Sequence, residues 1–157
     1  MPLIPEVTGF YDPRTGSVQY VVADPATSKC AIIDPVLDYD EKSGSIDTTH
    51  ADELLAFVAE RGYALEWILD THPHADHFSA ADYLKRHTGA PIAIGEHIVD
   101  VQKLWKSLYN LPDQRTDGAQ CGGRTLLDGK AHRRFPTRLR SCQSRFPGTD
   151  QRPDYGT

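Results

Sequence analysis

The stretch Leu65-Glu66-Trp67-Ile68-Leu69-Asp70-Thr71-His72-Pro73-His74-Ala75-Asp76-His77 decides the fold of this chain. Its first seven residues form a mostly apolar run, which predicts a buried β-strand. Four of the next six residues have side chains that bind metal ions: His72, His74, Asp76 and His77. The predicted strand therefore ends in a cluster of candidate ligands, at the place where α/β proteins put their functional loops.

Neutral imidazoles together with a carboxylate suit zinc, iron or manganese. An irregular turn can direct His72 and His74 toward one ion, while Asp76 and His77 face a second position. Pro73 fixes one backbone angle between the two histidines, so less entropy is lost when the ligands converge. A histidine-rich loop without a metal is the alternative, but it would concentrate positive charge below about pH 6 with no gain in packing. We therefore predict a metal site.

Elements on both sides of this loop alternate in type. Three β-like runs separated by Pro, Asp and Gly turns predict an antiparallel meander over residues 7–11, 17–23 and 30–33. A helix is predicted to start at Thr49, with Asp52 three residues later, and to close at Arg61-Gly62. After the candidate ligands, the periodicity predicts helix 79–87, strand 91–94 and helix 96–109. This order predicts an α/β fold, a sheet with helices packed on it.

The motif from Thr71 to His77 resembles the THxHxDH signature of the metallo-β-lactamase fold superfamily. Further segments are similar to the branch that contains the persulfide dioxygenases, next to the hydroxyacylglutathione hydrolases (glyoxalase II): residues 33–40, 67–72, 78–81 and 94–98. The resemblance covers roughly residues 5–112. It implies an αββα sandwich with the metal at the edge between two sheets.

The resemblance also implies roles for individual residues. His72 and His74 match ligands of the first metal position, and Asp76 and His77 match ligands of the second. Asp34 matches the acidic residue that braces the site loops, and Thr71 is assigned to the same structural support. The implied cofactor is one Fe(II) ion, held in persulfide dioxygenases with the help of the first histidine, here His72, or one or two Zn(II) ions. Three histidines match no ligand and are expected to be solvated or at helix ends: His50, His87 and His97.

Three functions follow from these assignments. The first is oxidation of a glutathione-type persulfide to sulfite and thiol. The second is hydrolysis of a thioester, in which two metals generate hydroxide and Asp76 is catalytic because it holds the second ion. The third is a non-catalytic fragment that binds metal weakly, because the Gly-His-Thr and Gly-Asp segments that complete the family's site do not occur in this sequence and the last histidine is His132.

Composition restricts the partners of the protein. The chain has 157 residues, 39% of them hydrophobic, and a formal net charge of -5, which disfavours binding to nucleic acid through bulk positive charge. It has no run of roughly 18 apolar residues and no signal-peptide pattern at its start, so we expect a cytoplasmic protein with no membrane partner. Three widely spaced cysteines indicate neither a disulfide framework nor a cysteine zinc site. We expect a small-molecule substrate, with a homodimer left open.

The last 47 residues differ from the rest. Residues 1–110 carry 8 Lys and Arg against 17 Asp and Glu, whereas residues 111–157 carry 9 against 5 and contain no Val or Ile. This composition disfavours packed strands and predicts an irregular segment. We therefore expect a metallo-β-lactamase-like first half over residues 1–112. Residues 113–157 would be an atypical tail, either disordered or a truncated, spliced or frame-shifted reading of a normal second half.

Overall fold

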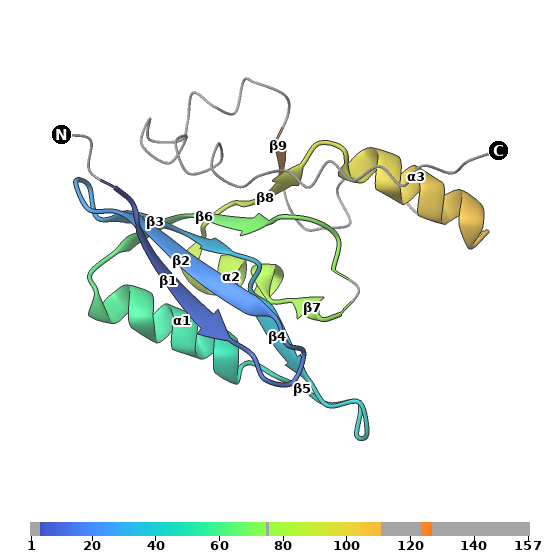
Figure 1. The fold of residues 1–157 in the computed structure, drawn as a ribbon, viewed down its shortest axis with the longest axis horizontal. Helices are drawn as coiled ribbons and strands as arrows, with labels where there is room; N and C mark the ends of the chain where they lie inside the picture. The colour runs from blue at the N-terminus through green and yellow to red at the C-terminus, as the bar shows by residue number, and fades with distance from the viewer. Residues whose placement is uncertain (1–3, 75, 111–123, 127–157) are drawn as a thin grey trace, which may run out of the picture.

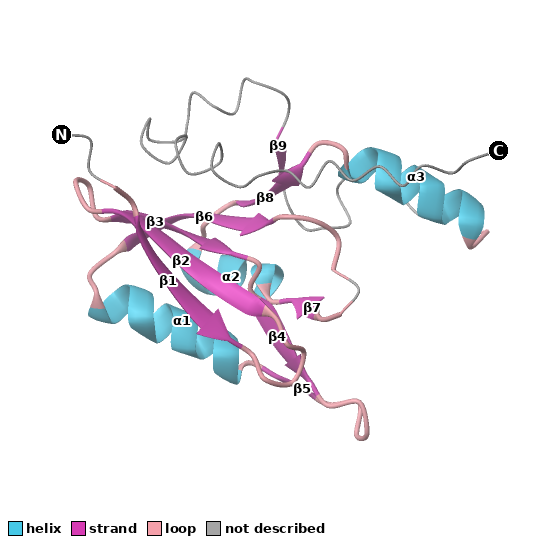
Figure 2. Ribbon diagram, in the orientation of Figure 1, coloured by secondary structure: helices cyan, strands magenta, loops and turns pink. Residues whose placement is uncertain are grey.

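The computed structural model describes residues 4–74, 76–110 and 124–126. In this part of the chain a large sheet has the strand order β1-β2-β3-β6-β8-β9, and a small sheet has the order β5-β4-β7 (Figures 1 and 2). The large sheet consists of β1 (Glu6–Tyr11), β2 (Val18–Asp24), β3 (Lys29–Ile33), β6 (Ala64–Asp70), β8 (Ile92–Gly95) and β9 (Arg124–Leu126). The small sheet consists of β4 (Val36–Tyr39), β5 (Ile46–Asp47) and β7 (Phe78–Ser79). The helices are α1 (Thr49–Glu60), α2 (Ala81–Thr88) and α3 (Ile98–Leu108).

The first three strands form the predicted antiparallel meander. From β3 onward the large sheet is parallel: β6 pairs with β3 on one side and with β8 on the other. Parallel neighbours require crossover connections, which the segments carrying α1 and α2 supply. The alternation of strands and helices read from the sequence is therefore confirmed, and the α/β fold class with it.

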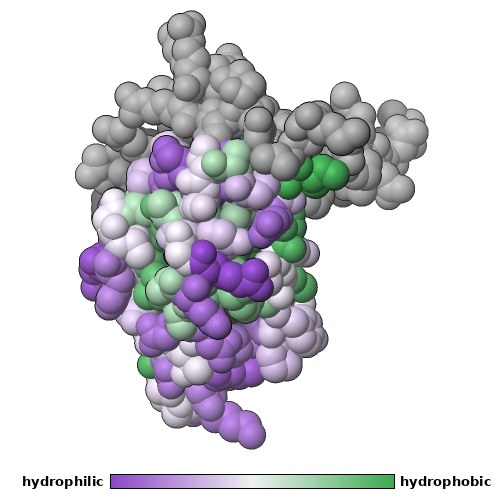
Figure 3. All heavy atoms as spheres, turned by 90° about the vertical axis from the view of Figure 1, so that its left-hand side faces the viewer, coloured by the Kyte–Doolittle hydropathy of each residue, from purple (hydrophilic) through white to green (hydrophobic). Residues whose placement is uncertain are grey.

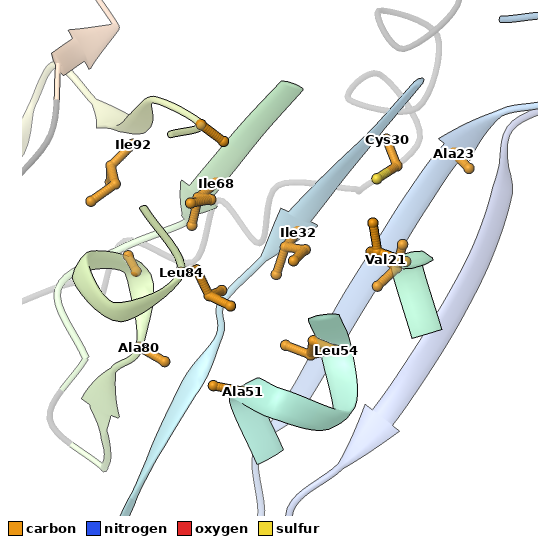
Figure 4. Close-up of a cluster of buried hydrophobic side chains, with 13 residues drawn as sticks. Val21, Ala23, Cys30, Ile32, Ala51, Leu54, Ile68, Ala80, Leu84 and Ile92 are labelled. Atoms are coloured by element: carbon orange, nitrogen blue, oxygen red, sulfur yellow. The ribbon is translucent and has the colours of Figure 1, made fainter. Parts of the chain in front are cut away.

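One hydrophobic cluster joins the large sheet to the first two helices (Figure 4). Ile32 of β3 and Ile68 of β6 are fully buried, and Leu54 of α1 and Leu84 of α2 pack against the same side of the sheet. Burying one side chain of this size contributes about 1.5–3 kcal/mol relative to leaving it in water. The central strands β3 and β6 are thus fixed by core packing, and their C-terminal ends are fixed with them.

Several details differ from the sequence prediction. Residues 36–39 and 46–47 form β4 and β5, two strands that the sequence pattern does not predict. Residues 78–79 pair with β4 as β7, so α2 begins at Ala81 and not at Ser79. These strands are only two to four residues long, too short for a periodic pattern to reveal them.

Helix α1 begins differently from the predicted capping box. Its N-cap residue is Thr48, whose hydroxyl makes no cap hydrogen bond to the backbone and instead donates to the Asp52 carboxylate at 2.9 Å. The Asp47 carboxylate accepts from the amides of Thr48 and Thr49 at 2.5 and 3.1 Å. An aspartate just ahead of the helix therefore satisfies the first free amides of α1.

The tail contains one strand in a segment whose composition disfavours strands. Residues 124–126 form β9, which lies parallel to β8 at the edge of the large sheet. The lack of Val and Ile argued against a strand here, but pairing with the exposed edge of β8 supplies backbone hydrogen bonds whatever the side chains are. The other residues of the predicted tail, 113–123 and 127–157, lie outside the described residues and its predicted disorder stays a prediction.

None of the helices within the described ranges is long and apolar enough to cross a membrane. Hydrophilic side chains cover much of the face seen in Figure 3, with apolar ones between them. Helix α3 keeps apolar side chains exposed, since Leu104 and Leu108 are 63% and 69% exposed and only Ile98 is buried. The predicted amphipathic helix is confirmed, but most of its apolar face makes no core contact within the described chain.

Candidate metal centre

The parallel pairing of β3 and β6 places their C-terminal ends side by side, and a site residue follows each of them. Asp34 follows β3 directly, and Thr71 follows β6 directly. The Asp34 amide donates to the Leu69 carbonyl at 2.8 Å, and its carboxylate accepts from the Thr71 amide at 2.7 Å and from the Thr71 hydroxyl at 2.8 Å. Asp34 has a φ of 51°, in the left-handed region, which aspartate tolerates better than most residues. The chain therefore turns sharply at Asp34 and ties the two strand ends together.

Asp34 also holds the second histidine. The Nε2 atom of His74 lies 3.0 Å from a carboxylate oxygen of Asp34. Burial alone would raise the pKa of Asp34, but the hydrogen bonds from His74 and Thr71 outweigh it and lower the pKa. Burial alone would lower the pKa of His74, but the hydrogen bond to Asp34 and the nearby carboxylates of Asp70 and Asp76 raise it. The site thus contains a hydrogen-bonded Asp34–His74 pair.

The predicted ligands converge in two overlapping groups. In the first group the donor atoms of Asp34, His72 and His74 lie within 4.8 Å of one another, and in the second those of His74, Asp76 and His77 do. The rings of His72 and His77 lie on either side of His74, with centroid distances of 4.4 and 4.1 Å. His74 therefore belongs to both groups. The structure brings together all of the residues that the sequence analysis proposed as ligands or support.

Ser17 also contacts this cluster, although it lies 59 residues before Asp76 in the sequence. It directly precedes β2, and its hydroxyl oxygen lies 2.9 Å from the Asp76 carboxylate and 3.1 Å from Nδ1 of His77. The hydrogen bond from Ser17, then contacts within the loop and with His77, lower the pKa of Asp76 to about 2. Sequence reasoning did not identify Ser17, because a serine after the turn sequence Asp12-Pro13-Arg14-Thr15-Gly16 reads as ordinary turn chemistry.

Asp70 is a second residue that the sequence analysis missed. It is the last residue of β6, is 8% exposed, and accepts from the Ser79 hydroxyl at 2.9 Å. One of its oxygens lies 3.9 Å from Nε2 of His74. Burial raises the pKa of the Asp70 carboxyl, although the Ser79 hydrogen bond opposes the shift. A buried acid below the histidine cluster can orient His74, as outer carboxylates commonly do for metal-binding histidines.

The donor atoms in this cluster fit a metal ion. The side chain of His77 is 2% exposed, and within the described part of the chain its Nε2 atom has no hydrogen-bond partner. A buried polar atom without a partner is costly, and a coordinated cation is one way to satisfy it. Three imidazoles and a carboxylate are suitable ligands for zinc or ferrous iron. The geometry is therefore compatible with a metal position next to His77.

Among the histidines that match no ligand, His50 lies at a helix end, one of the two expected positions, but it is mostly buried. Its side chain is 15% exposed, and Nδ1 makes a short contact with a carboxylate oxygen of Asp38, which is itself buried. His50 lies in the first turn of α1, as a helix-end role requires, but it is not solvated. His87 and His97 lie at the end of α2 and just before α3, where His87 contacts the Tyr83 carbonyl and His97 faces Asp100. His132 lies outside the described residues.

The Asp34–His74 pair predicts a pH dependence of stability in the metal-free protein. The pKa of Asp34 is lowered from 3.8 in the folded state, so its contribution is present above about pH 4 and is lost as pH falls through the folded-state pKa. The pKa of His74 is raised from 6.5, so its contribution is complete below about pH 6.5 and is lost as pH rises through the folded-state pKa.

The free energy of unfolding, measured by urea denaturation of the chelator-treated protein, should therefore differ most between wild type and His74→Gln in the window from about pH 4 to pH 6.5. The difference should shrink at pH 8. A difference that stays constant from pH 5 to pH 8 would contradict the assigned ion pair.

The sequence matches a known family profile and is similar to several known proteins. Residues 12–120 match the family profile described as the metallo-beta-lactamase superfamily. A protein of Xylella fastidiosa (strain Temecula1 / ATCC 700964) named beta-lactamase hydrolase-like protein is 66% identical over 116 residues, 74% of this chain and 27% of that protein. Glyoxylase B2 of Dictyostelium discoideum is 44% identical over 113 residues, 71% of this chain and 39% of that protein.

One solved structure with a similar fold is ETHE1 from Myxococcus xanthus. It is 31% identical with a TM-score of 0.47, over 56% of this chain and 34% of that one. The chain therefore spans between about a quarter and two fifths of the length of these proteins. The residues that match the family profile, 12–120, contain both strand ends and all of the candidate ligands.

Proposed function

The chain belongs to the metallo-beta-lactamase superfamily, and from this premise we propose that His72, His74, Asp76 and His77 bind a divalent metal ion that acts on a small sulfur-containing substrate. The observation that carries this proposal is the convergence of the four donors at the end of β6, with Nε2 of His77 buried and unpartnered within the described residues. Membership in the superfamily implies metal binding. The identity of the metal, Fe(II) or Zn(II), belongs to the proposal.

The four residues of the loop have different proposed roles in metal binding. His72 is exposed at the mouth of the loop and its Nδ1 lies 2.8 Å from the Thr71 hydroxyl, which leaves Nε2 to face an ion. His74 is shared between the two donor groups and is oriented by Asp34. Asp76 is 54% exposed, so a substrate can approach from its side. His77 closes the buried side of the site.

For the substrate we propose a glutathione-type persulfide. The overall reaction is RSS⁻ + O₂ + H₂O → RSH + SO₃²⁻ + H⁺, in which the terminal sulfur is oxidised, O₂ is reduced, and the sulfur–sulfur bond is broken. Bound Fe(II) would supply the redox chemistry that this reaction with O₂ requires. The similarity of residues 33–40, 67–72, 78–81 and 94–98 to the persulfide dioxygenase branch supports this substrate over others.

Thioester hydrolysis is the second candidate, and the name of one relative, a hydrolase-like protein, supports hydrolysis in general. A beta-lactamase hydrolase-like protein and a glyoxylase are both similar to this chain. In this reaction Asp76 would hold a second ion, and its carboxylate is already ionised at neutral pH because its pKa is about 2. The same loop can serve either chemistry, so the loop alone does not select the substrate.

Two assays on the metal-loaded chain distinguish the candidates. Oxygen uptake that depends on added glutathione persulfide and on Fe(II) is the expected result. Loss of thioester absorbance with S-lactoylglutathione in the presence of Zn(II), without oxygen uptake, would replace the dioxygenase with the hydrolase. If both rates stay at the level of the metal alone, the chain is a metal-binding unit without catalysis, and the proposed activity is wrong.

A further inference from the structure

Ser17 is held at the metal loop by a rigid turn between β1 and β2. The Asp12 amide donates to the Ser17 carbonyl at 2.9 Å, which closes the turn. The buried Asp12 carboxylate accepts from the Thr15 hydroxyl at 2.6 Å and from the Arg14 amide at 3.0 Å. The Arg14 guanidinium in turn donates to the buried Asp38 at 2.7 Å. The position of Ser17 is therefore set by the fold and does not depend on the metal loop itself.

The hydrogen positions around Ser17 follow from a count of donors. The Ser17 hydroxyl has one hydrogen, and it donates this hydrogen to the Asp76 carboxylate across 2.9 Å. The Ser17 oxygen is then an acceptor for Nδ1 of His77 at 3.1 Å, and the same Asp76 oxygen is a second acceptor at 3.3 Å. Nδ1 of His77 must therefore carry a hydrogen.

The other ring nitrogen of His77 has the opposite requirement. Nε2 is buried and has no partner within the described part of the chain, so a hydrogen there would be an unpaired buried donor. The ring with its hydrogen on Nδ1 pairs that hydrogen and avoids a buried donor without an acceptor at Nε2. This tautomer leaves the lone pair of Nε2 free, and a lone pair is what a metal ion needs.

We infer that Ser17 is a positioning residue that fixes the His77 ring in the Nδ1–H tautomer and holds one oxygen of Asp76, so that the β1–β2 turn presets the metal loop. The inference rests on the proposed metal-binding function for its consequence, but the tautomer itself is a property of the metal-free chain. With one Asp76 oxygen on Ser17, the other lies 4.0 Å from Nδ1 of His74, on the side of the histidine cluster.

The test compares wild type with Ser17→Ala, Ser17→Thr and the control Ser43→Ala. Ser43 is an exposed serine whose hydroxyl bonds to Ser45 in the turn between β4 and β5. In Figure 1 this turn lies at a tip of the molecule. Histidine tautomers are read from long-range ¹H–¹⁵N spectra of the metal-free 157-residue chain at pH 7.5, with His77 assigned through His77→Gln. Affinity is read by titration with Co(II).

Wild type should show His77 as the Nδ1–H tautomer. Ser17→Ala should shift the ring toward a mixture of tautomers and raise the Kd for Co(II) about tenfold, the size expected for loss of a group that orients a ligand. Ser17→Thr keeps the hydroxyl and should restore both readouts, and Ser43→Ala should change neither. Backbone amide spectra check that each variant is folded.

Two results would overturn the inference. The first is an Nε2–H tautomer of His77 in wild type. The second is a Ser17→Ala spectrum in which the His77 ring signals match those of wild type. If wild type binds no Co(II), the proposed function fails, but the tautomer comparison still decides the role of Ser17.

Discussion

Replacing His72 by alanine is expected to abolish the activity of the metal-loaded chain, whether that activity is persulfide oxidation or thioester hydrolysis. His72 is the first donor after β6 and belongs to the donor group with Asp34 and His74. It is exposed and makes few packing contacts, so its loss should leave the fold intact. Removing a direct ligand should cost more than the roughly 10- to 100-fold loss seen when a group behind a ligand is removed.

The control for this experiment is His97→Ala. His97 is also exposed, its side chain being 87% accessible, and its Nδ1 lies 3.3 Å from the Asp100 carboxylate in the first turn of α3. Initial rates and the Kd for Co(II) are measured for wild type and both variants. We expect His97→Ala to match wild type and His72→Ala to show neither turnover nor tight binding. An unchanged rate and an unchanged Kd in His72→Ala would remove that residue from the site.

Ile68→Ala is expected to produce the largest loss of stability, about 2–5 kcal/mol in the free energy of unfolding. Ile68 is fully buried in β6, between β3 and β8, and belongs to the core cluster that also contains Leu54 and Leu84. Truncation removes buried methyl groups and leaves a cavity that the two flanking strands cannot close. Because β6 carries Asp70 and leads directly into the metal loop, loss of metal affinity should accompany the loss of stability.

Urea denaturation of the metal-free protein measures this effect, and Ile46→Ala is the matched control. Ile46 is also an isoleucine in a strand, but it is 60% exposed in β5. Its replacement should change the free energy of unfolding by no more than about 0.5 kcal/mol. Equal losses for the two variants would mean that the cluster around Ile68 is not the core that holds β6 in place.

The parts of the fold that the sequence predicts well are those with a strong hydrophobic pattern. The meander, the strand that ends at Asp70 and the helices from Thr49 and Ile98 all have an apolar face that must be buried, and periodicity reveals such a face. The small sheet was missed because its strands bury few side chains. Strand β9 was missed because its pairing uses backbone atoms of β8, which no side-chain pattern records.

The same distinction applies to the site. The four candidate ligands are close in sequence, so a motif can identify them, and Asp34 was reached only through resemblance. Ser17 and Asp70 were missed for different reasons. Ser17 lies 59 residues from its partner Asp76, and only the folded sheet brings the two together. Asp70 is the polar end of an apolar strand, and its burial depends on how β7 folds over it through Ser79.

The Asp38–His50 contact shows the same limit. A histidine in the first turn of a predicted helix is expected to be exposed to solvent, because no nearby residue in the sequence indicates a hydrogen-bond partner. The partner comes from β4, a strand that the sequence did not reveal. The partner of His50 was therefore missed because strand β4 was missed.

The most direct test of the central claim, that this loop is a metal site, is titration of the metal-free wild-type chain with Co(II), followed by its visible absorption spectrum. We expect saturable binding of at least about one ion per chain, with d–d bands typical of nitrogen and oxygen ligands, and displacement of these bands by Zn(II). Binding that does not saturate, or bands that persist unchanged when His74 is replaced by alanine, would contradict it.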